Sequence, residues 1–208
     1  AFVYQWTPAG WNEIELIASD GASGDSFGYS VSITSDGTTV AVGARDRDEA
    51  QAGQGAVYIF SRDLGGTNVW GQLKKLTTTD DAVYARFGQS LALSSDGSTL
   101  VVGASGQMVG ANAEQGLVHV FQKDHGGANN WGLLATLVAN NGDYQDQFGH
   151  SVAVSTNGTI IAAGAPWHNG RRGACYVFRY SGGYSQSQLI SDANGADNDY
   201  MGQSVSIS

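Results

Sequence analysis

Short stretches in which bulky residues alternate with small or polar ones recur along this chain. In residues 29–33 the small side chains of Ser30 and Ser32 alternate with the branched Val31 and Ile33. Successive side chains of a β-strand point to opposite faces, so this stretch predicts a strand with one shallow face and one bulky face. The same alternation returns at 89–93 and 150–154. We therefore expect sheets that stack face to face, with large side chains packed on small ones.

Each of these strands belongs to a motif, bulky residue-Gly-x-Ser-hydrophobic, that occurs four times. The motif begins at Phe27, Phe87, Phe148 and Met201, at steps of 60, 61 and 53 residues. In the first three copies an Asp-Gly or Asn-Gly hairpin turn follows, then a second strand, a third, and a fourth that starts with Trp or Tyr. A long period of short strands is typical of β-propellers. The predicted fold is all-β, a β-propeller built from four-stranded blades of about 60 residues.

Aligning the repeats divides the chain into three complete blades, 27–86, 87–147 and 148–200, and two partial ones. Residues 1–26 align with the third and fourth strands of a blade, and residues 201–208 with a first strand. Three arrangements fit this division. The chain is a single propeller domain whose termini share one blade, a segment of a larger propeller, or a subunit whose missing strands come from a neighbouring molecule. We favour the segment, and then the assembly.

Composition narrows the classes of partner. Nineteen acidic and ten basic residues give the 208-residue chain a formal net charge of −9, which repels nucleic acid and anionic lipid. We expect neither a nucleic-acid partner nor membrane insertion, because no apolar run approaches the roughly 20 residues that span a bilayer. Cys175, the only cysteine, aligns with Val57 and Val118 and is predicted to be a small buried hydrophobe. A disulfide framework within the chain is excluded.

The motifs resemble the FG-GAP repeat of the integrin α-subunit N-terminal propeller and of many secreted microbial and protist proteins. The resemblance rests on three Phe-Gly pairs, each followed by Val-Gly-Ala or Ala-Gly-Ala, and on the Gly-x-x-x-x-Phe strand behind each. These are Phe27-Gly28 with 42–44, Phe87-Gly88 with 102–104, and Phe148-Gly149 with 163–165. The family implies a β-propeller, usually seven-bladed, located outside the cell or on its surface and devoted to adhesion or ligand recognition.

Calcium is the one ion that the resemblance suggests. In the family the first hairpin is often a calcium loop, but residues 35–37, 95–97 and 156–158 read Ser-Asp-Gly or Thr-Asn-Gly. One side-chain oxygen donor and a glycine make a tight turn, not a cage of six to eight oxygens. The family's calcium site is therefore not carried over, and no other cofactor is predicted.

A separate cation candidate is the acidic loop formed by Asp46, Asp48 and Glu49. Arg45 and Arg47 interleave with these acids, which indicates surface ion pairs instead. Further acidic residues precede each motif, where they either hold calcium loosely or cap local backbone amides, and we favour capping. They are Asp20, Asp25, Asp80, Asp81, Asp143, Asp146, Asp192, Asp197 and Asp199.

The strongest candidates for a ligand or partner surface are aromatic and basic residues in one loop. Trp167 and His168 follow the Gly-Ala-Pro of the third copy, with Arg171 and Arg172 behind them. An exposed Trp beside arginines suits stacking on a sugar ring or a protein hot spot. His150 occupies a position that varies between the repeats.

Asn157 lies in the only N-glycosylation sequon, Asn-Gly-Thr, at a predicted hairpin tip. The same three residues also fit an ordinary Asn-Gly turn.

The functional hypothesis is a non-catalytic extracellular propeller that recognises a protein or glycan through its rim loops. The first alternative is a structural subunit of an extracellular fibre or sheath, joined through incomplete terminal blades. The second is a propeller that binds or hydrolyses glycans, for which nothing distinguishes two of the carboxylates from the rest. No catalytic residue is predicted.

Overall fold

The computed structural model describes residues 1–78 and 82–207 and consists of antiparallel sheets. A two-stranded hairpin contains β1 (Phe2–Thr7) and β2 (Gly10–Glu15). The first blade contains β3 (Phe27–Ile33), β4 (Thr39–Ala44), β5 (Ala56–Ser61) and β6 (Gly71–Leu76). The second contains β7 (Phe87–Leu93), β8 (Thr99–Ala104), β9 (Leu117–Gln122) and β10 (Gly132–Leu137). The third contains β11 (Ser151–Val154), β12 (Ile160–Ala165), β13 (Ala174–Tyr180) and β14 (Tyr184–Ile190).

The strands of each four-stranded sheet are hydrogen-bonded in chain order. A meander of four antiparallel strands is the unit of a propeller blade, so the predicted all-β fold of propeller blades is confirmed. The short helix α1 (His168–Arg171) lies in the loop between β12 and β13. Within the described ranges no helix is long and apolar enough to cross a membrane.

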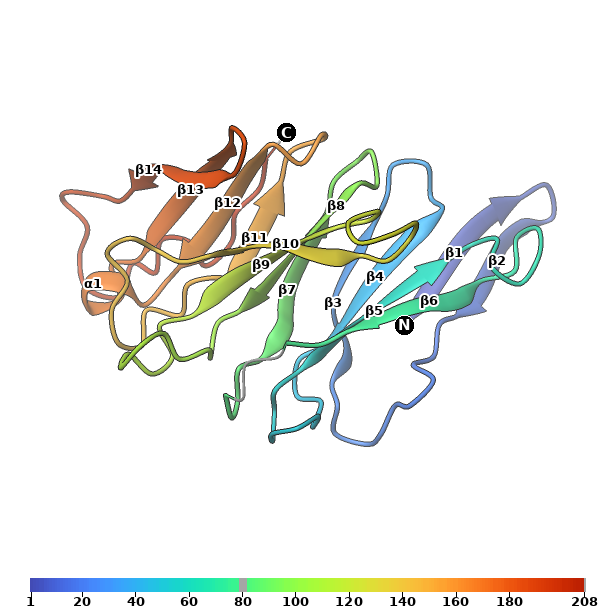
Figure 1. Ribbon diagram of the computed structural model, residues 1–208, viewed down its shortest axis with the longest axis horizontal. Coiled ribbons are helices and arrows are strands. Elements are labelled where there is room, and N and C mark those ends of the chain that lie inside the picture. Colours follow the sequence, from blue (N-terminus) through green and yellow to red (C-terminus); the bar gives the residue numbers. More distant parts are fainter. Residues whose placement is uncertain (79–81, 208) are drawn as a thin grey trace.

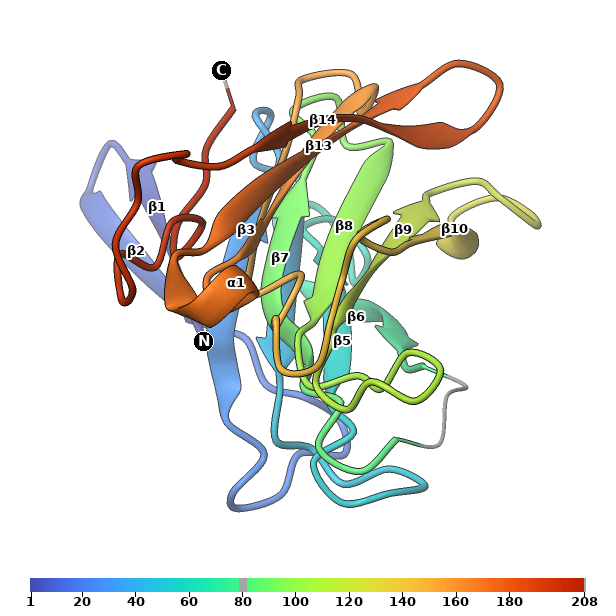
Figure 2. The same cartoon turned by 90° about the vertical axis from the view of Figure 1, so that its left-hand side faces the viewer.

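The three blades lie side by side, with the hairpin at one end of the molecule and the third blade at the other (Figure 1). The first strands β3, β7 and β11 form the contact between blades, because β7 touches both of the others. The loops that join second and third strands, with α1 in the third of them, lie at the same end of the blades and form the edge that points downward in the end-on view (Figure 2). This edge is called the rim below.

Large side chains of one blade pack on small side chains of its neighbour, as the alternation predicted. Phe87, Leu91 and Leu93 of the second blade pack in one cluster with Ala41 and Ile59 of the first. The third blade packs on the second in the same manner. Each such buried side chain contributes about 1.5–3 kcal/mol to the free energy of folding, so these residues are core and not a binding surface.

Neighbouring backbones approach closely where two glycines meet. A Cβ on Gly43 would lie 2.2 Å from the carbonyl oxygen of Gly88, and a Cβ on Gly103 would lie 2.0 Å from that of Gly149. Beside this contact the Ser30 hydroxyl donates to the Gly88 carbonyl oxygen over 2.7 Å. The same serine bond recurs at the next two junctions, at 2.8 and 2.7 Å. Glycine is therefore required for blades to reach hydrogen-bonding distance.

Residues 202–207, which the repeat predicts to be a first strand, are not hydrogen-bonded in a sheet. A first strand pairs with the second strand of its blade, and residues 202–207 have no such neighbour among the described residues. The segment still packs as its counterparts do, because Gly202 lies against Gly164 and accepts the Ser151 hydroxyl.

Two further predictions about single residues can be compared with their burial. Trp131 is buried in the core, consistent with a structural role. Cys175 is only half-buried, and burial raises the pKa of its thiol.

Candidate ligand site at the rim

Two positions of the repeat differ from copy to copy, while the bulky residue, the glycine and the serine are kept. The position before the bulky residue holds Ser26, Arg86, Gln147 or Tyr200, and the position after the glycine holds Tyr29, Gln89, His150 or Gln203. In every copy the second of these residues donates its backbone N–H to the carbonyl of the first, at 2.9–3.1 Å. The four residues form a tight turn, which brings both variable side chains to the same end of the strand.

The residue before each bulky position has a left-handed backbone, although none of the four is glycine. Their φ values are 55°, 57°, 54° and 53°. The amide of Arg86 donates to the Gly53 carbonyl over 3.1 Å, and that of Tyr200 to the Arg171 carbonyl over 2.9 Å. Such conformations cost on the order of 1–3 kcal/mol each and persist where the surroundings hold them. The fold therefore holds these side chains in fixed directions.

A hollow of about 580 Å³ lies between these turns. Five of its six lining residues occupy the two variable positions, and the sixth is Trp167. The lining residues are Arg86, Gln147, His150, Trp167, Tyr200 and Gln203. The lining thus combines aromatic rings, amide groups, an imidazole and a guanidinium group, and these are the groups that bind polar ligands in pockets.

His150 connects three successive blades. Its Nδ1 lies 2.9 Å from Nε2 of Gln89, and its Nε2 lies 3.2 Å from Nε2 of Gln203. Burial, and then the positive charges of Arg45 and Arg86, lower the pKa of His150 below its ordinary value. The Nε2 of a glutamine only donates, and a neutral imidazole has a single acceptor nitrogen, so the neutral ring accepts a hydrogen bond from one of these two amides.

Trp167 forms one wall of the hollow. The Arg171 guanidinium lies 4.7 Å from the centre of its ring, and Tyr200 meets it edge-on with ring centres 6.2 Å apart. The backbone N–H of Tyr200 also donates to the carbonyl of Arg171. The structure therefore brings Trp167 and Arg171, two of the four predicted surface residues, to the same place.

The other two predicted surface residues have different neighbours. His168 Nδ1 lies 2.8 Å from Oδ2 of Asp146, on the far side of Trp167, where both residues line a second hollow of about 280 Å³. Arg172 is exposed and pairs with Asp197 at 3.1 Å. The four residues thus contribute to one rim surface but not to one pocket.

The pKa values of two histidines are expected to shift in opposite directions. The Asp146 carboxylate raises the pKa of His168 above the ordinary 6.5, because it holds the charged ring. The stability that the His168–Asp146 pair contributes is complete below the pKa that His168 has in the unfolded chain. It is lost as the pH rises through the higher pKa of His168 in the folded protein. The pKa of His150 is lowered in the folded protein. Its contribution to stability is therefore present above the pKa that it has in the unfolded chain and is lost as the pH falls through its folded-state pKa.

An NMR titration of the histidine ring protons measures both shifts. We expect the His168 midpoint above 6.5 and the His150 midpoint below it. His168→Gln and His150→Gln assign the signals, and Asp146→Asn should return the His168 midpoint toward 6.5. Equal midpoints for the two histidines would contradict the geometry.

The acidic loop of the calcium hypothesis forms the ion pairs that its arginines suggested. The Arg45 Nε lies 3.3 Å from Oδ2 of Asp46, and the Arg47 Nε lies 3.1 Å from Oε1 of Glu49. Asp48 accepts a backbone N–H over 2.8 Å. Among the described residues no three His, Cys, Asp or Glu side chains are grouped to hold a metal ion. Calcium binding by this loop stays an untested hypothesis.

Several acidic residues that precede the motifs cap backbone amides, as we favoured. The carboxylate of Asp25 accepts the N–H of Ala22, and that of Asp146 accepts the N–H of Asp143, both over 2.7 Å. The carboxylate of Asp199 accepts the N–H of Ala196 in the same way. Asp80 and Asp81 lie outside the described residues.

Asn157 is exposed at a hairpin tip, where its Oδ1 accepts the hydroxyl of Thr159 over 2.7 Å. Asp36 and Asp96 make the same turn contacts in the first two blades. The turn therefore explains the sequon residues without a glycan, and glycosylation of Asn157 stays a prediction.

Comparison with known families identifies the repeat. The FG-GAP repeat model matches residues 11–60, 70–121 and 131–178. The chain belongs to the FG-GAP repeat family. Each matched repeat is one strand out of phase with a blade, because it begins in the last strand of one sheet and ends in the third strand of the next. Each FG-GAP repeat therefore links two blades covalently.

No curated protein sequence matches the chain. Among solved structures, the fold is similar to that of Sqt1 from Saccharomyces cerevisiae, with a TM-score of 0.51 and 13% sequence identity. The match covers 82% of this chain and 37% of Sqt1. At this identity the likeness concerns the fold alone.

Four residues that line the hollow were not predicted as site residues from the sequence, namely Arg86, Gln147, Tyr200 and Gln203. The signal that could have found them was present, because Gln203 aligns with His150, and the other three align with one another at the variable position three residues earlier. What the repeat alignment did not reveal is that a left-handed turn directs both positions into one hollow beside Trp167.

Proposed function

We propose that this FG-GAP protein is a non-catalytic recognition module outside the cell or on its surface, and that it binds its ligand at the rim hollow. The observation that carries the proposal is that the repeat positions that vary line this hollow, while the packing positions are kept. Binding proteins commonly place varied side chains on a constant scaffold. The known occurrence of FG-GAP repeats in extracellular proteins supports the location.

The chemistry of the hollow favours a glycan as the ligand. Tyr200 and Trp167 offer aromatic surface for a sugar ring, and Gln147 and Gln203 offer amides for hydroxyl groups. Among the described residues no carboxylate forms an ion pair with Arg86, so its charge is available to an acidic sugar. We therefore expect glycans that carry uronic acids to bind better than neutral ones.

Hydrolysis of a glycan has no support at this hollow. Glycosidases generally use a pair of carboxyl groups, and the six lining residues include none. In the adjoining hollow the Asp146 carboxylate is already held by His168 and by the N–H of Asp143. Binding without catalysis is the function that these residues fit.

A glycan array followed by calorimetry tests the proposal. We expect the 208-residue chain to bind acidic oligosaccharides, and Trp167→Ala to weaken binding about tenfold or more. Trp11→Ala is the matched control, since Trp11 is exposed on the hairpin at the opposite end of the molecule. Arg86→Gln should weaken acidic ligands more than neutral ones.

Two results would count against this function. If Trp167→Ala and Trp11→Ala weakened binding equally, the ligand would not bind in the hollow. Absence of binding to every glycan on the array would reject the glycan and leave a protein ligand as the alternative for the same surface.

A further inference from the structure

Arg86 brings a positive charge to the rim hollow. Its side chain lines the hollow, and among the described residues no carboxylate pairs with its guanidinium. Arg45, at the same end of the first blade, is already engaged. Its Nε lies 3.3 Å from Oδ2 of Asp46, and its guanidinium carbon lies 3.8 Å from the centre of the Tyr29 ring. The charge of Arg86 is therefore the one that remains available to a ligand in the hollow.

His150 lines the same hollow as Arg86. Among the six lining side chains, only the His150 imidazole gains or loses a proton near neutral pH. The charged groups that act on the ring are Arg45 and Arg86, which lower its pKa together with burial. The Tyr200 phenol is the other titratable group of the lining. The two arginines therefore oppose a charge on the ring, and an anion beside it would favour one.

The two glutamines beside the ring can hold it in either protonation state. The neutral ring accepts a hydrogen bond from Nε2 of Gln89 or of Gln203, whereas a protonated ring donates from both nitrogens. Turning a glutamine amide over exchanges its Nε2 for Oε1, which accepts. The Oε1 of Gln89 is buried and has no partner in the part of the chain that the structure describes, so the turn breaks no bond of that oxygen. The amides therefore also fit a charged ring.

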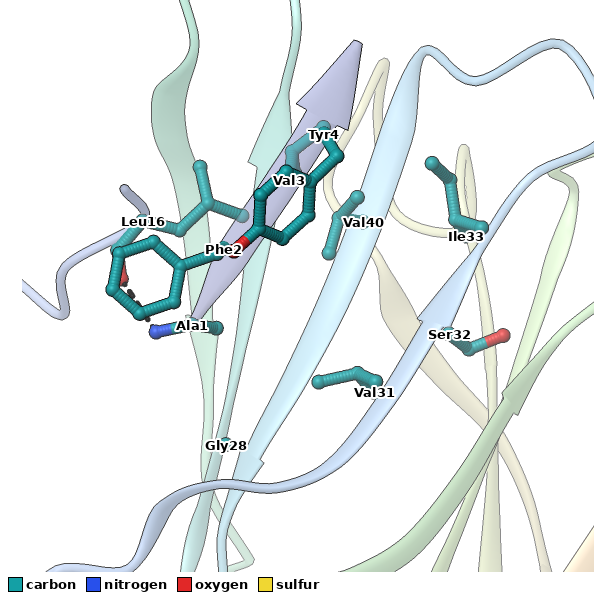
Figure 3. A pocket seen from close by; sticks show the side chains of 10 residues that line it. All are labelled: Ala1, Phe2, Val3, Tyr4, Leu16, Gly28, Val31, Ser32, Ile33 and Val40. Carbon is teal, nitrogen blue, oxygen red and sulfur yellow. Dashed lines mark hydrogen bonds between the residues drawn. The ribbon is translucent and has the colours of Figure 1, made fainter. Parts of the chain in front are cut away.

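The groove between β1 and β3 shows what an anion would lack elsewhere. Its volume is about 460 Å³, but no charged side chain lines it. Val31 and Val40 point into this groove, and the Ala1 ammonium group donates to the Leu16 carbonyl oxygen over 3.1 Å (Figure 3). An anion that entered such a lining would lose its hydration without gaining a partner. Of these two hollows, the rim hollow is therefore the one suited to an anion.

We propose that Arg86 and the protonated ring of His150 together bind the acidic group of the ligand, a carboxylate or a sulfate, and that the ring takes up a proton from the solvent as this group binds. The inference rests on the proposed function in that it takes the ligand to be an acidic glycan. Arginine holds such a group through two parallel hydrogen bonds. The charged ring adds a second positive charge on the same side of the hollow.

Proton uptake and anion binding strengthen each other. The anion offsets the repulsion between Arg86 and the charged ring, so it raises the pH at which His150 loses its proton. By linkage, the anion binds more tightly to the protonated site by the same factor. An increase of one pH unit in the midpoint corresponds to about tenfold in affinity. The affinity should therefore be highest below the ligand-free midpoint and should fall as the pH rises through the anion-bound one.

An NMR titration of the His150 ring protons tests the proposal without a glycan. Sodium sulfate and sodium glucuronate are compared with sodium chloride at equal ionic strength, since both probes stay ionised between about pH 5 and 8. We expect both anions to raise the His150 midpoint by about half a pH unit or more relative to chloride. The anion with the larger effect identifies the acidic group. His125, exposed in the loop after β9, is the internal control and should respond to neither.

Arg86→Gln tests whether Arg86 forms the other half of the site. Gln147 occupies the same motif position with a φ of 54°, close to the 57° of Arg86, so the turn accepts a glutamine. In chloride the His150 midpoint should rise, because the repulsion from Arg86 is gone. Sulfate should then add less than half of the wild-type increase. Arg179→Gln removes an equal charge from the exposed far end of β13, outside the hollow, and should respond as the wild type does.

His150→Gln tests the coupling to a glycan. Gln89 and Gln203 occupy the same motif position, so the strand start accepts this side chain. Calorimetry of an acidic oligosaccharide selected by the array should show binding about fivefold to tenfold tighter at pH 5.5 than at pH 7.5 for the wild type. We expect His150→Gln to abolish this dependence and His125→Gln to keep it. A neutral oligosaccharide should bind equally at both pH values.

Two results would overturn the proposal. One is a His150 midpoint that sulfate and glucuronate leave at its value in chloride. The other is a response that Arg86→Gln and Arg179→Gln reduce equally. Anions that raise the midpoint of a protein that binds no glycan would keep the anion site and reject the glycan ligand. Glycan binding without any effect of anions on His150 would keep the proposed function and reject this inference.

Discussion

Phe87→Ala is expected to lower the free energy of unfolding by about 4 kcal/mol. The Phe87 side chain is fully buried and meets Phe121 edge-on, with ring centres 6.0 Å apart. Its other side is covered by the first blade, in one cluster with Ala41 and Ile59. Removing the ring therefore leaves a cavity between two sheets that hold their positions independently and cannot close it.

Phe27→Ala is the matched control for this substitution. Phe27 occupies the same motif position and makes the same kind of ring contacts, with Tyr58 and Phe60. It is only half-buried, because the hairpin covers its blade incompletely. Denaturant unfolding should show a loss for Phe27→Ala less than half that for Phe87→Ala. Equal losses would mean that stacking between blades contributes little at this position.

Gly103→Ala is expected to destabilise the protein by about 3 kcal/mol. The added methyl group would lie 2.0 Å from the Gly149 carbonyl oxygen and 2.4 Å from the Ser90 hydroxyl oxygen. The carbonyl is backbone, so relief requires the second and third blades to separate. Their separation also breaks the bond from Ser90 to Gly149.

Gly183→Ala controls for the general effect of replacing glycine. No atom lies within 4 Å of a Cβ at Gly183, and its φ is outside the left-handed region. Thermal and denaturant unfolding of this variant should match the wild type within about 0.5 kcal/mol. If Gly103→Ala were equally silent, the blades would not be held together by close backbone contact.

The sequence by itself determined the blade. Strand alternation such as Ser30-Val31-Ser32-Ile33, with Asp-Gly and Asn-Gly turns at a fixed offset, predicts four strands and the faces they bury, because these are local properties of the backbone. Ion pairs between Arg45 and Asp46 were also predictable, since the partners are neighbours in the chain.

Only the tertiary structure decided which residues meet at the rim and which faces remain open. Arg86 and Tyr200 are 114 residues apart in the chain, and they line one hollow because successive blades place the same turn side by side. In the same way, Val31 and Leu91 have equivalent sequence surroundings, but one is covered and the other is not. Burial of a blade face depends on the neighbouring sheet, and local pattern carries no information about whether that neighbour is present.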